Sequence, residues 1–226
     1  MKLFFIESDG EFIMTTLGYI AVALLAAIVF AAIFLLKPKK EKEELKISTT
    51  KKLAFCSMAI AVGFVASYLK IFRLPLGGSV TLLSMLFITL VGYWYGLRAG
   101  LLAAFTYSLL QFLQGPYIIN FWQVCFDYLF AFTALGLSGL FKDRKNGLIT
   151  GYIVAILARG LFHSIGGYLF FMSWIPDTFP KNLSSIYPLV YNYSYILAEG
   201  AITVALLFIP PVRKAMERVK IMAIKE

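Results

Sequence analysis

The sequence has few charged residues, few cysteines and a single histidine, and each scarcity excludes a class of protein. Charged residues make up 15% of the 226 residues, whereas hydrophobic residues make up 60%, and the mean hydropathy is +0.81. A soluble domain has only about 45–50% apolar residues. The two cysteines, Cys56 and Cys125, lie in separate apolar segments without metal-binding or disulfide spacing, so we expect both to be packing residues.

The chemistry of catalysis and of nucleotide hydrolysis is also missing. The sequence contains no nucleophile–base pair, no phosphate-binding loop and no Walker motif. His163 has no second histidine and no cysteine near it in the sequence, so a metal site is not expected. We therefore predict that the chain is not an enzyme, has no catalytic residues and needs no cofactor.

Long apolar segments account for the excess of hydrophobic residues. A helix needs about 20 residues to cross the hydrocarbon of a bilayer, and an open sheet cannot satisfy its backbone there. The sequence therefore predicts an all-α, polytopic transmembrane helix bundle without strands. Its seven apolar segments cover about 17–36, 53–69, 80–97, 99–113, 118–141, 148–171 and 187–209.

A charged stretch at residues 37–52 separates the first apolar segment from the other six. It is rich in lysine and glutamate, which is typical of a solvated linker. We expect two parts, with residues 1–50 forming an N-terminal transmembrane anchor and charged cytoplasmic linker, and residues 51–226 forming a six-helix domain. Acidic residues precede the first segment and basic residues follow it, so we expect a retained anchor rather than a cleaved signal peptide.

The net charge of +9 follows a membrane topology. Basic residues are concentrated at 37–52, at Arg98, at 142–145 and in a short tail after Pro210-Pro211, and these regions alternate along the chain. Cytoplasmic loops carry such an excess of lysine and arginine. We therefore expect the N-terminus outside and the C-terminus in the cytoplasm, and no nucleic-acid partner.

Four ionisable residues lie inside the predicted spans, where a charge is costly and usually functional: Asp127, Arg159, His163 and Glu199. Arg159 and Glu199 both fall near mid-depth, and we predict that they form a structural ion pair. Asp127 lies about 14 Å below the outer face at 1.5 Å per residue. Its neighbours are aromatic, which suits a planar organic cation. Pairing of Asp127 with Arg159, or with hydroxyl groups, is the alternative.

Polar side chains on the seventh segment add to this outer region. Tyr187 and Asn192 lie at its outer start, where a hydroxyl and an amide suit the edge of a heteroaromatic ring. An interfacial aromatic belt accounts for most of the neighbouring tyrosines. Groups from three segments thus reach one level, which predicts a small-molecule pocket that opens to the outside.

Small residues recur four positions apart on two segments. Gly92, Gly96 and Gly100 are expected to allow close packing of helices inside the bundle. Ser57 and Ala61 have the same spacing on the second segment. For this pair, packing inside the bundle and a surface for a partner subunit are both open.

From about Lys51 to the C-terminus, the sequence resembles the thiamine-specific substrate-binding (S) components of energy-coupling-factor (ECF) transporters. The resemblance rests on four stretches in a fixed order: GLRAGLL at 96–102, QGPYI at 114–118 with Gln123 and Asp127-Tyr128, ARGLFH at 158–163 with Gly166-Gly167, and YPLVYN at 187–192. It implies a core of six helices, with the first apolar segment as an extra N-terminal helix, and a thiamine pocket near the outer face.

The resemblance also implies partners and site residues. The partners would be thiamine, a transmembrane coupling protein and two ABC-type ATPase subunits, in the plasma membrane of a prokaryote. Asp127, where many relatives have glutamate, would meet the cationic ligand, and Phe171 replaces a stacking tryptophan. Ser57 and Ala61 would contact the coupling protein. The implied thiamine-binding residues are Tyr117, Asp127, Tyr128, His163, Phe171, Tyr187 and Asn192.

Two other functions are compatible with the residues. The first is an S component for another vitamin, such as riboflavin or a pyrimidine precursor, although a neutral ligand has little use for Asp127. The second is an intramembrane enzyme that uses Asp127, Arg159 and His163, although no nucleophile or metal is placed beside them.

Overall fold

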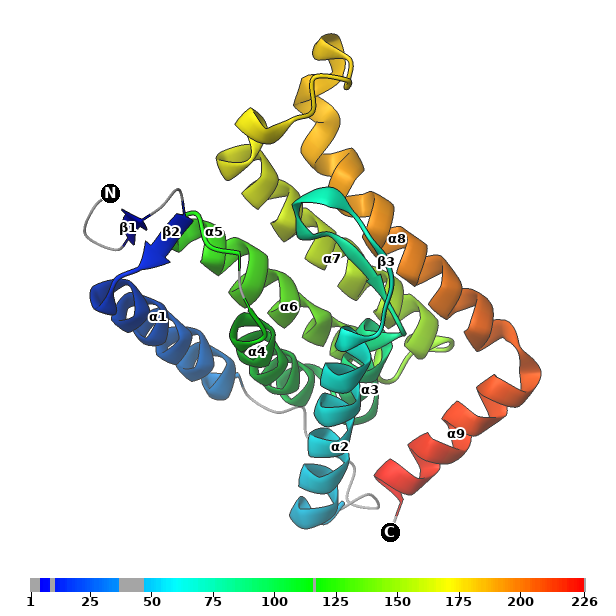
Figure 1. Ribbon diagram of the computed structural model, residues 1–226. Helices are drawn as coiled ribbons and strands as arrows, with labels where there is room; N and C mark the ends of the chain where they lie inside the picture. The colour runs from blue at the N-terminus through cyan, green and yellow to red at the C-terminus, as the bar shows by residue number, and fades with distance from the viewer. Residues whose placement is uncertain (1–4, 9–10, 37–46, 116, 226) are drawn as a thin grey trace.

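The computed structural model describes residues 5–8, 11–36, 47–115 and 117–225, which form a bundle of helices (Figure 1). The predicted linker at 37–52 lies mostly outside the described residues, which resume at residue 47. All seven predicted segments coincide with helical stretches. The helices are α1 (Thr16–Leu35), α2 (Thr49–Tyr68), α3 (Ser84–Tyr95), α4 (Leu97–Leu113), α5 (Phe121–Val124), α6 (Ala131–Thr133), α7 (Gly147–Phe170), α8 (Tyr187–Phe208) and α9 (Pro210–Ile224).

Several helices are long and apolar enough to cross a bilayer. Four are long and apolar enough on their own, namely Thr16–Leu35, Thr49–Tyr68, Phe121–Phe141 and Gly147–Phe170. The stretch that contains α8 meets the same criterion together with α9. The other two, α3 and α4, have 12 and 17 residues and are joined at Gly96. The prediction of a polytopic helical membrane protein is confirmed.

The fifth segment is not a uniform α-helix. Between α5 and α6, the residues Cys125–Phe130 form a π-helix, and Ala134–Phe141 continue as a 3-10 helix. A π-helical turn contains one extra residue and is often found at functional sites. This turn contains Asp127, so the local irregularity lies where the sequence predicted the ligand.

The prediction that strands are absent is wrong. Strand β1 (Phe5–Ser8) pairs with β2 (Glu11–Met14), and β3 (Lys70–Arg73) pairs with β4 (Ser79–Thr81), both antiparallel. The argument from unsatisfied backbone holds only within the hydrocarbon. The β3–β4 hairpin connects α2 to α3 at the end of the bundle, and the four residues of β3 are exposed.

Helix α3 runs through the middle of the core. Met85, Ile88 and Val91 are almost fully buried, and α3 packs against α2, α4, α7 and the 3-10 helix. Glycines allow a close helix crossing, as predicted. A Cβ on Gly100 would lie 2.7 Å from the carbonyl oxygen of Gly136, so the backbones of the two helices touch there.

Helix α1 packs along the outside of the bundle (Figure 1). The Phe30 ring lies 6.1 Å from the ring of Phe105 on α4, and the Arg98 guanidinium lies over the Phe34 ring at 4.5 Å. Most of the large side chains of α1 are exposed. This distribution fits an accessory helix that is surrounded mainly by lipid.

Helix α9 replaces the predicted short basic tail. The chain turns by 89° between α8 and α9, and prolines occupy the first turn of α9, a position that proline favours. Its inner face is fixed to α3, because the Tyr95 hydroxyl donates to the Ala223 carbonyl at 3.0 Å and Lys220 Nζ donates to the Tyr93 hydroxyl at 2.9 Å. The tail therefore lies across the end of the bundle.

Candidate ligand-binding site

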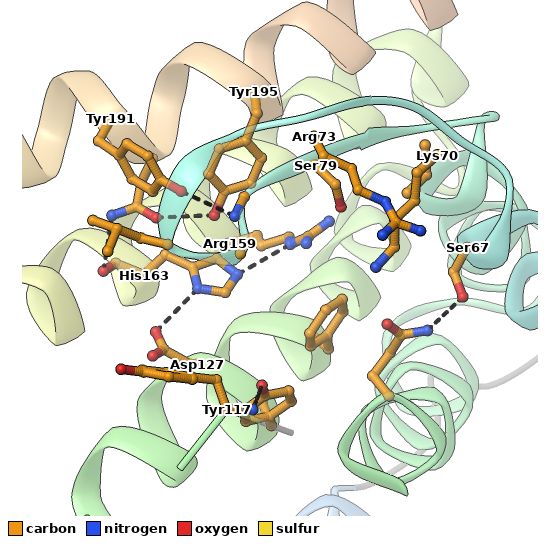
Figure 2. A pocket seen from close by; sticks show the side chains of 18 of the residues that line it. Ser67, Lys70, Arg73, Ser79, Tyr117, Asp127, Arg159, His163, Tyr191 and Tyr195 are labelled. Atoms are coloured by element: carbon orange, nitrogen blue, oxygen red, sulfur yellow. Dashed lines mark hydrogen bonds and ion pairs between the residues drawn. The ribbon is translucent and has the colours of Figure 1, made fainter. Parts of the chain in front are cut away.

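A cavity of about 450 Å³ lies between the helices, under the β3–β4 hairpin (Figure 2). This volume is within the range of about 300–1,000 Å³ found for small-molecule sites. The structure brings the residues of the predicted pocket together on its wall, although their binding roles remain predictions. The lining includes Tyr117, Asp127, Tyr128, His163, Phe171, Tyr187 and Asn192.

Asp127 points into the cavity and not toward lipid (Figure 2). Its Oδ2 accepts a hydrogen bond from Gln123 Nε2 at 2.8 Å, and its Oδ1 lies 3.1 Å from His163 Nδ1. Gly166 makes this approach possible, because a Cβ there would lie 2.9 Å from Oδ1. The side chain is 16% exposed. Asp127 is thus a largely buried carboxylate on a cavity wall, with acceptor capacity left over.

His163 connects Asp127 to Arg159. Arg159 Nε donates to His163 Nε2 at 3.4 Å, so Nε2 is the acceptor and Nδ1 carries the proton that faces Asp127. The imidazole ring meets the rings of Phe132 and Tyr195 at steep angles, with centroids 6.0 Å and 6.4 Å away. These contacts fix the plane of the ring beside the cavity.

Aromatic side chains form the wall next to Asp127. Tyr117 stacks on Phe171 with ring centroids 6.2 Å apart, and its other contact is an edge-on Trp174. The backbone N–H of Tyr117 donates to the Tyr128 hydroxyl at 2.9 Å, which ties the loop to the π-helix. The sequence did not indicate Trp174, because no periodicity links it to Tyr117.

Asn192 is more constrained than the sequence suggested. Its Nδ2 donates to the carbonyls of His163 and Pro188, at 3.2 Å and 2.9 Å, and its Oδ1 accepts from the Tyr195 hydroxyl at 2.9 Å. Both amide hydrogens are therefore used within the protein. Only the second lone pair of Oδ1 remains for a ligand.

The predicted ion pair between Arg159 and Glu199 is not formed, which corrects the sequence interpretation. The Glu199 carboxylate accepts from Thr81 N, Thr81 Oγ1 and Met85 N, at 2.9, 2.6 and 3.2 Å. The Ser84 hydroxyl donates to Thr81 Oγ1 at 2.6 Å and lies 3.4 Å from the carboxylate. Arg159 instead lies over the Phe132 ring at 4.3 Å. The physical reason is the start of α3, whose free N–H groups and dipole satisfy a carboxylate without a cation.

The hairpin is tied to α8 by a residue that the sequence placed in an aromatic belt. The Tyr191 hydroxyl accepts from Gly78 N at 2.9 Å and donates to the Pro75 carbonyl. Tyr195, one turn further on, is buried and also lines the cavity. The sequence gives little indication of these roles, because Tyr191 and Tyr195 lie in a tyrosine-rich stretch that resembles an interfacial belt.

Ser57 and Ala61 lie away from the cavity, on the exposed face of α2. Large apolar neighbours on the same helix are exposed too, with Met58 at 61% and Val65 at 62%. The two small residues therefore do not pack inside the bundle. The role of this face as a partner surface remains a prediction.

The fold and the site together define a class of protein. A multi-pass helical membrane protein encloses a small-molecule cavity, and the described residues contain no cluster of histidine, cysteine and acidic side chains that would hold a metal. The chain belongs to the thiamine transporter protein family (Thia_YuaJ), whose family model matches residues 53–218. It is therefore a member of a transporter family and not an enzyme.

Two relatives show the extent of the likeness. The chain is 33% identical over 157 residues to the thiamine transporter ThiT of Bacillus subtilis (strain 168), a match that covers 60% of this chain and 77% of the relative. A solved structure of ThiT from Listeria monocytogenes shares the fold with a TM-score of 0.57 at 23% identity, and covers 71% of this chain and 94% of that chain. The family resemblance seen in the sequence is confirmed, and α1 precedes the matched residues.

Proposed function

We propose that this chain captures thiamine at the outer face of a prokaryotic plasma membrane, as the S component of an ECF transporter. The observation that supports this most strongly is the Asp127 carboxylate. It is largely buried, lines a cavity beside stacked aromatic rings, and receives two hydrogen bonds from the described residues. A desolvated carboxylate with free acceptor capacity attracts a cation strongly, and aromatic faces add to that attraction.

The arrangement of the wall suggests how thiamine binds. The positively charged part of the ligand lies against Asp127, and its rings lie along the aromatic surface of Tyr117 and Phe171. His163 presents its ring beside them. Tyr187 and the remaining acceptor of Asn192 are left for the edge of the pyrimidine.

The charge distribution supports an orientation in the membrane. With the C-terminus in the cytoplasm, the basic helix α9 lies at the inner face and the β3–β4 hairpin at the outer face. The cavity then opens to the outside, where an uptake protein meets its substrate. Residues 1–50 form an anchor and cytoplasmic linker in this arrangement, and residues 51–226 form the thiamine-binding domain.

ATP-driven transport would require partner subunits, because the sequence has no ATP-binding loop of its own. The exposed apolar face of α2 that includes Ser57 and Ala61 supports contact with a transmembrane coupling protein, since small residues let helices approach closely. Two ABC-type ATPase subunits would supply the energy. Co-purification of the coupling module with wild-type protein, and its loss with Ala61→Trp, tests this part of the proposal.

Isothermal titration of the purified full-length protein in detergent tests thiamine capture. We expect thiamine to bind with a submicromolar dissociation constant, and neutral riboflavin not to compete. Absence of thiamine binding below about 1 µM, or about −8 kcal/mol, contradicts the proposal. Competition by riboflavin or by a neutral pyrimidine would identify a different vitamin.

A further inference from the structure

The wall that presents Asp127 to the cavity has a back face, and helix α1 covers part of it (Figure 1). Val124 directly precedes the π-helix and Leu129 lies within it, and they are 1% and 4% exposed. Val124 packs against Val22 of α1, and Leu129 belongs to a buried cluster that includes Ala26 of α1. The turn that aims the carboxylate at the ligand is therefore packed against a helix on the outside of the bundle.

The same packing extends to the loop before the fifth segment. Phe121 and Tyr128 pack against the cluster of Val22 and Val124. The Tyr128 hydroxyl accepts from the backbone N–H of Tyr117 at 2.9 Å, and both tyrosines line the cavity. None of the residues of α1 lines the cavity itself. A shift of α1 would thus reach two residues of the cavity wall without any contact between α1 and the ligand.

Helix α1 has one buried face and one exposed face. Gly18, Val22 and Ala26 are buried and follow one another at intervals of four residues. Leu24 and Ile28 are 61% and 65% exposed. Small residues at this spacing let two helices approach closely. An anchor that is surrounded by lipid on all sides needs no such face, so α1 packs on the bundle in a defined rotational position.

We propose that α1 is a positioning helix for the ligand site, and that Val22 and Ala26 hold the π-helix in the place that Asp127 needs to meet the ligand. A π-helical turn is rare and interrupts the regular hydrogen bonding of the α-helix around it, so its geometry depends on packing. The family model begins at residue 53, so this packing comes from a part of the chain outside the family match. The inference rests on the proposed function, because it assumes that Asp127 contacts a cationic ligand.

Substitutions at two adjacent alanines of α1 test the proposal in the full-length protein. Ala26→Leu adds volume to the buried cluster that includes Leu129, whereas Ala27→Leu adds the same volume on the exposed face. We expect Ala26→Leu to raise the dissociation constant for thiamine roughly three- to tenfold, the coupling expected within one packed network. Most of this change should appear as faster dissociation, measured by stopped flow beside titration calorimetry. Ala27→Leu should bind thiamine as the wild type does.

A second pair of variants changes the packing in the opposite direction. Val22→Ala removes volume against Val124, and should also weaken thiamine binding. Leu24→Ala removes more apolar surface, but from the exposed face, and should leave binding unchanged. If Ala26→Leu does not fold, the comparison of Val22→Ala with Leu24→Ala decides the question, because a smaller side chain introduces no steric clash.

An uncharged thiamine analogue, with a neutral ring in place of the thiazolium, separates positioning from stability. The measured quantity is the ratio of the dissociation constant of the analogue to that of thiamine. Because α1 acts through Asp127, Ala26→Leu and Val22→Ala should weaken thiamine more than the analogue and so lower this ratio. A loss of stability alone would weaken both compounds equally and leave the ratio unchanged. In the Asp127→Asn background the two α1 variants should have smaller effects on thiamine affinity.

The possible failures are distinguishable. If the variants on the buried and exposed faces of α1 have equal effects, α1 is only an anchor and thiamine capture stands. The same conclusion follows if the melting temperature of Val22→Ala falls while the ratio keeps its wild-type value. If the wild-type protein does not bind thiamine, the proposed function fails, and the positioning role of α1 fails with it.

Discussion

Two carboxylates line the same cavity, and their surroundings differ. Glu199 receives three hydrogen bonds, two of them from backbone N–H groups at β4 and the start of α3, and the Ser84 hydroxyl lies 3.4 Å away. Asp127 receives two, from Gln123 and His163, and faces aromatic rings. An ionised carboxylate accepts about four hydrogen bonds. Glu199 is therefore held mainly by donors of β4 and α3 and fastens the bundle, whereas Asp127 has more capacity for a ligand. Depth in the membrane does not separate the two roles, but the number of bonds received does.

The sharpest test of this contrast is Asp127→Asn. The amide keeps the size of the side chain but removes the charge, so we expect thiamine affinity to fall by about ten- to a hundredfold, or about 1.4–2.8 kcal/mol. The melting temperature should fall by no more than the loss of one hydrogen bond explains, because the amide accepts from only one of Gln123 and His163. Titration calorimetry and thermal unfolding in the same detergent measure both quantities. An unchanged affinity would remove Asp127 from the binding site.

Glu199→Gln should have the opposite profile. The amide nitrogen must face at least one donor among Thr81, Ser84 and Met85, so a buried hydrogen bond is lost. We expect a loss of unfolding free energy of about 1–2 kcal/mol, and a smaller change in thiamine affinity than Asp127→Asn causes. A fall in affinity without a fall in melting temperature would contradict the structural role of Glu199.

Gly166→Ala tests how closely Asp127 must approach α7. The added Cβ would lie 2.9 Å from Asp127 Oδ1, so the carboxylate must shift away from His163. We expect thiamine affinity to fall by roughly three- to tenfold, since a displaced contact loses about 1 kcal/mol. In the Asp127→Asn background the same change should cost less, because the contact is already weakened. Additive losses in this cycle would show that Gly166 acts elsewhere.

Tyr191→Phe is expected to have the smallest effect. It removes the hydroxyl that joins the hairpin to α8, which is worth about 1 kcal/mol. Amide hydrogens of residues 70–81 should exchange faster with solvent, and thiamine should dissociate a few times faster. Tyr193→Phe is the matched control, because that hydroxyl donates to the Leu157 carbonyl at 2.7 Å and touches neither the hairpin nor the cavity. Equal hydrogen-exchange rates at residues 70–81 in both variants would show that Tyr191 does not hold the hairpin against α8.

The sequence predicted the helices and several residues around the cavity, such as Asp127, from local composition and depth. Phe171 and His163 were assigned to the cavity through the family resemblance. Apolar length located the spans, and the position of Asp127 along its segment gave its distance from the outer face. The position along a segment does not show in which direction around the helix axis a side chain points. Arg159 and Glu199 were placed at similar depths, but depth does not show which residues face each other, so the predicted ion pair was wrong.

Other features depend on tertiary contacts that leave little trace in composition. The β3–β4 hairpin contains Gly77 and Gly78 and resembles an ordinary turn, while its position is determined by Tyr191. Helix α9 has a basic composition typical of a tail, and its position depends on hydrogen bonds to Tyr93 and Tyr95. Helix propensities do not distinguish the π-helix at Cys125–Phe130 from an ordinary α-helix, so the sequence did not predict it.

That π-helix changes the directions in which side chains point between the two halves of one span. A single additional residue in a turn rotates everything beyond it by about 100° relative to an uninterrupted α-helix. The interrupted turn itself aims the Asp127 carboxylate at the solute, while the half after it independently presents Gly136 to α4 for close packing. Deleting one residue between 125 and 130 would force both halves into a shared register, and either recognition or assembly would then be lost.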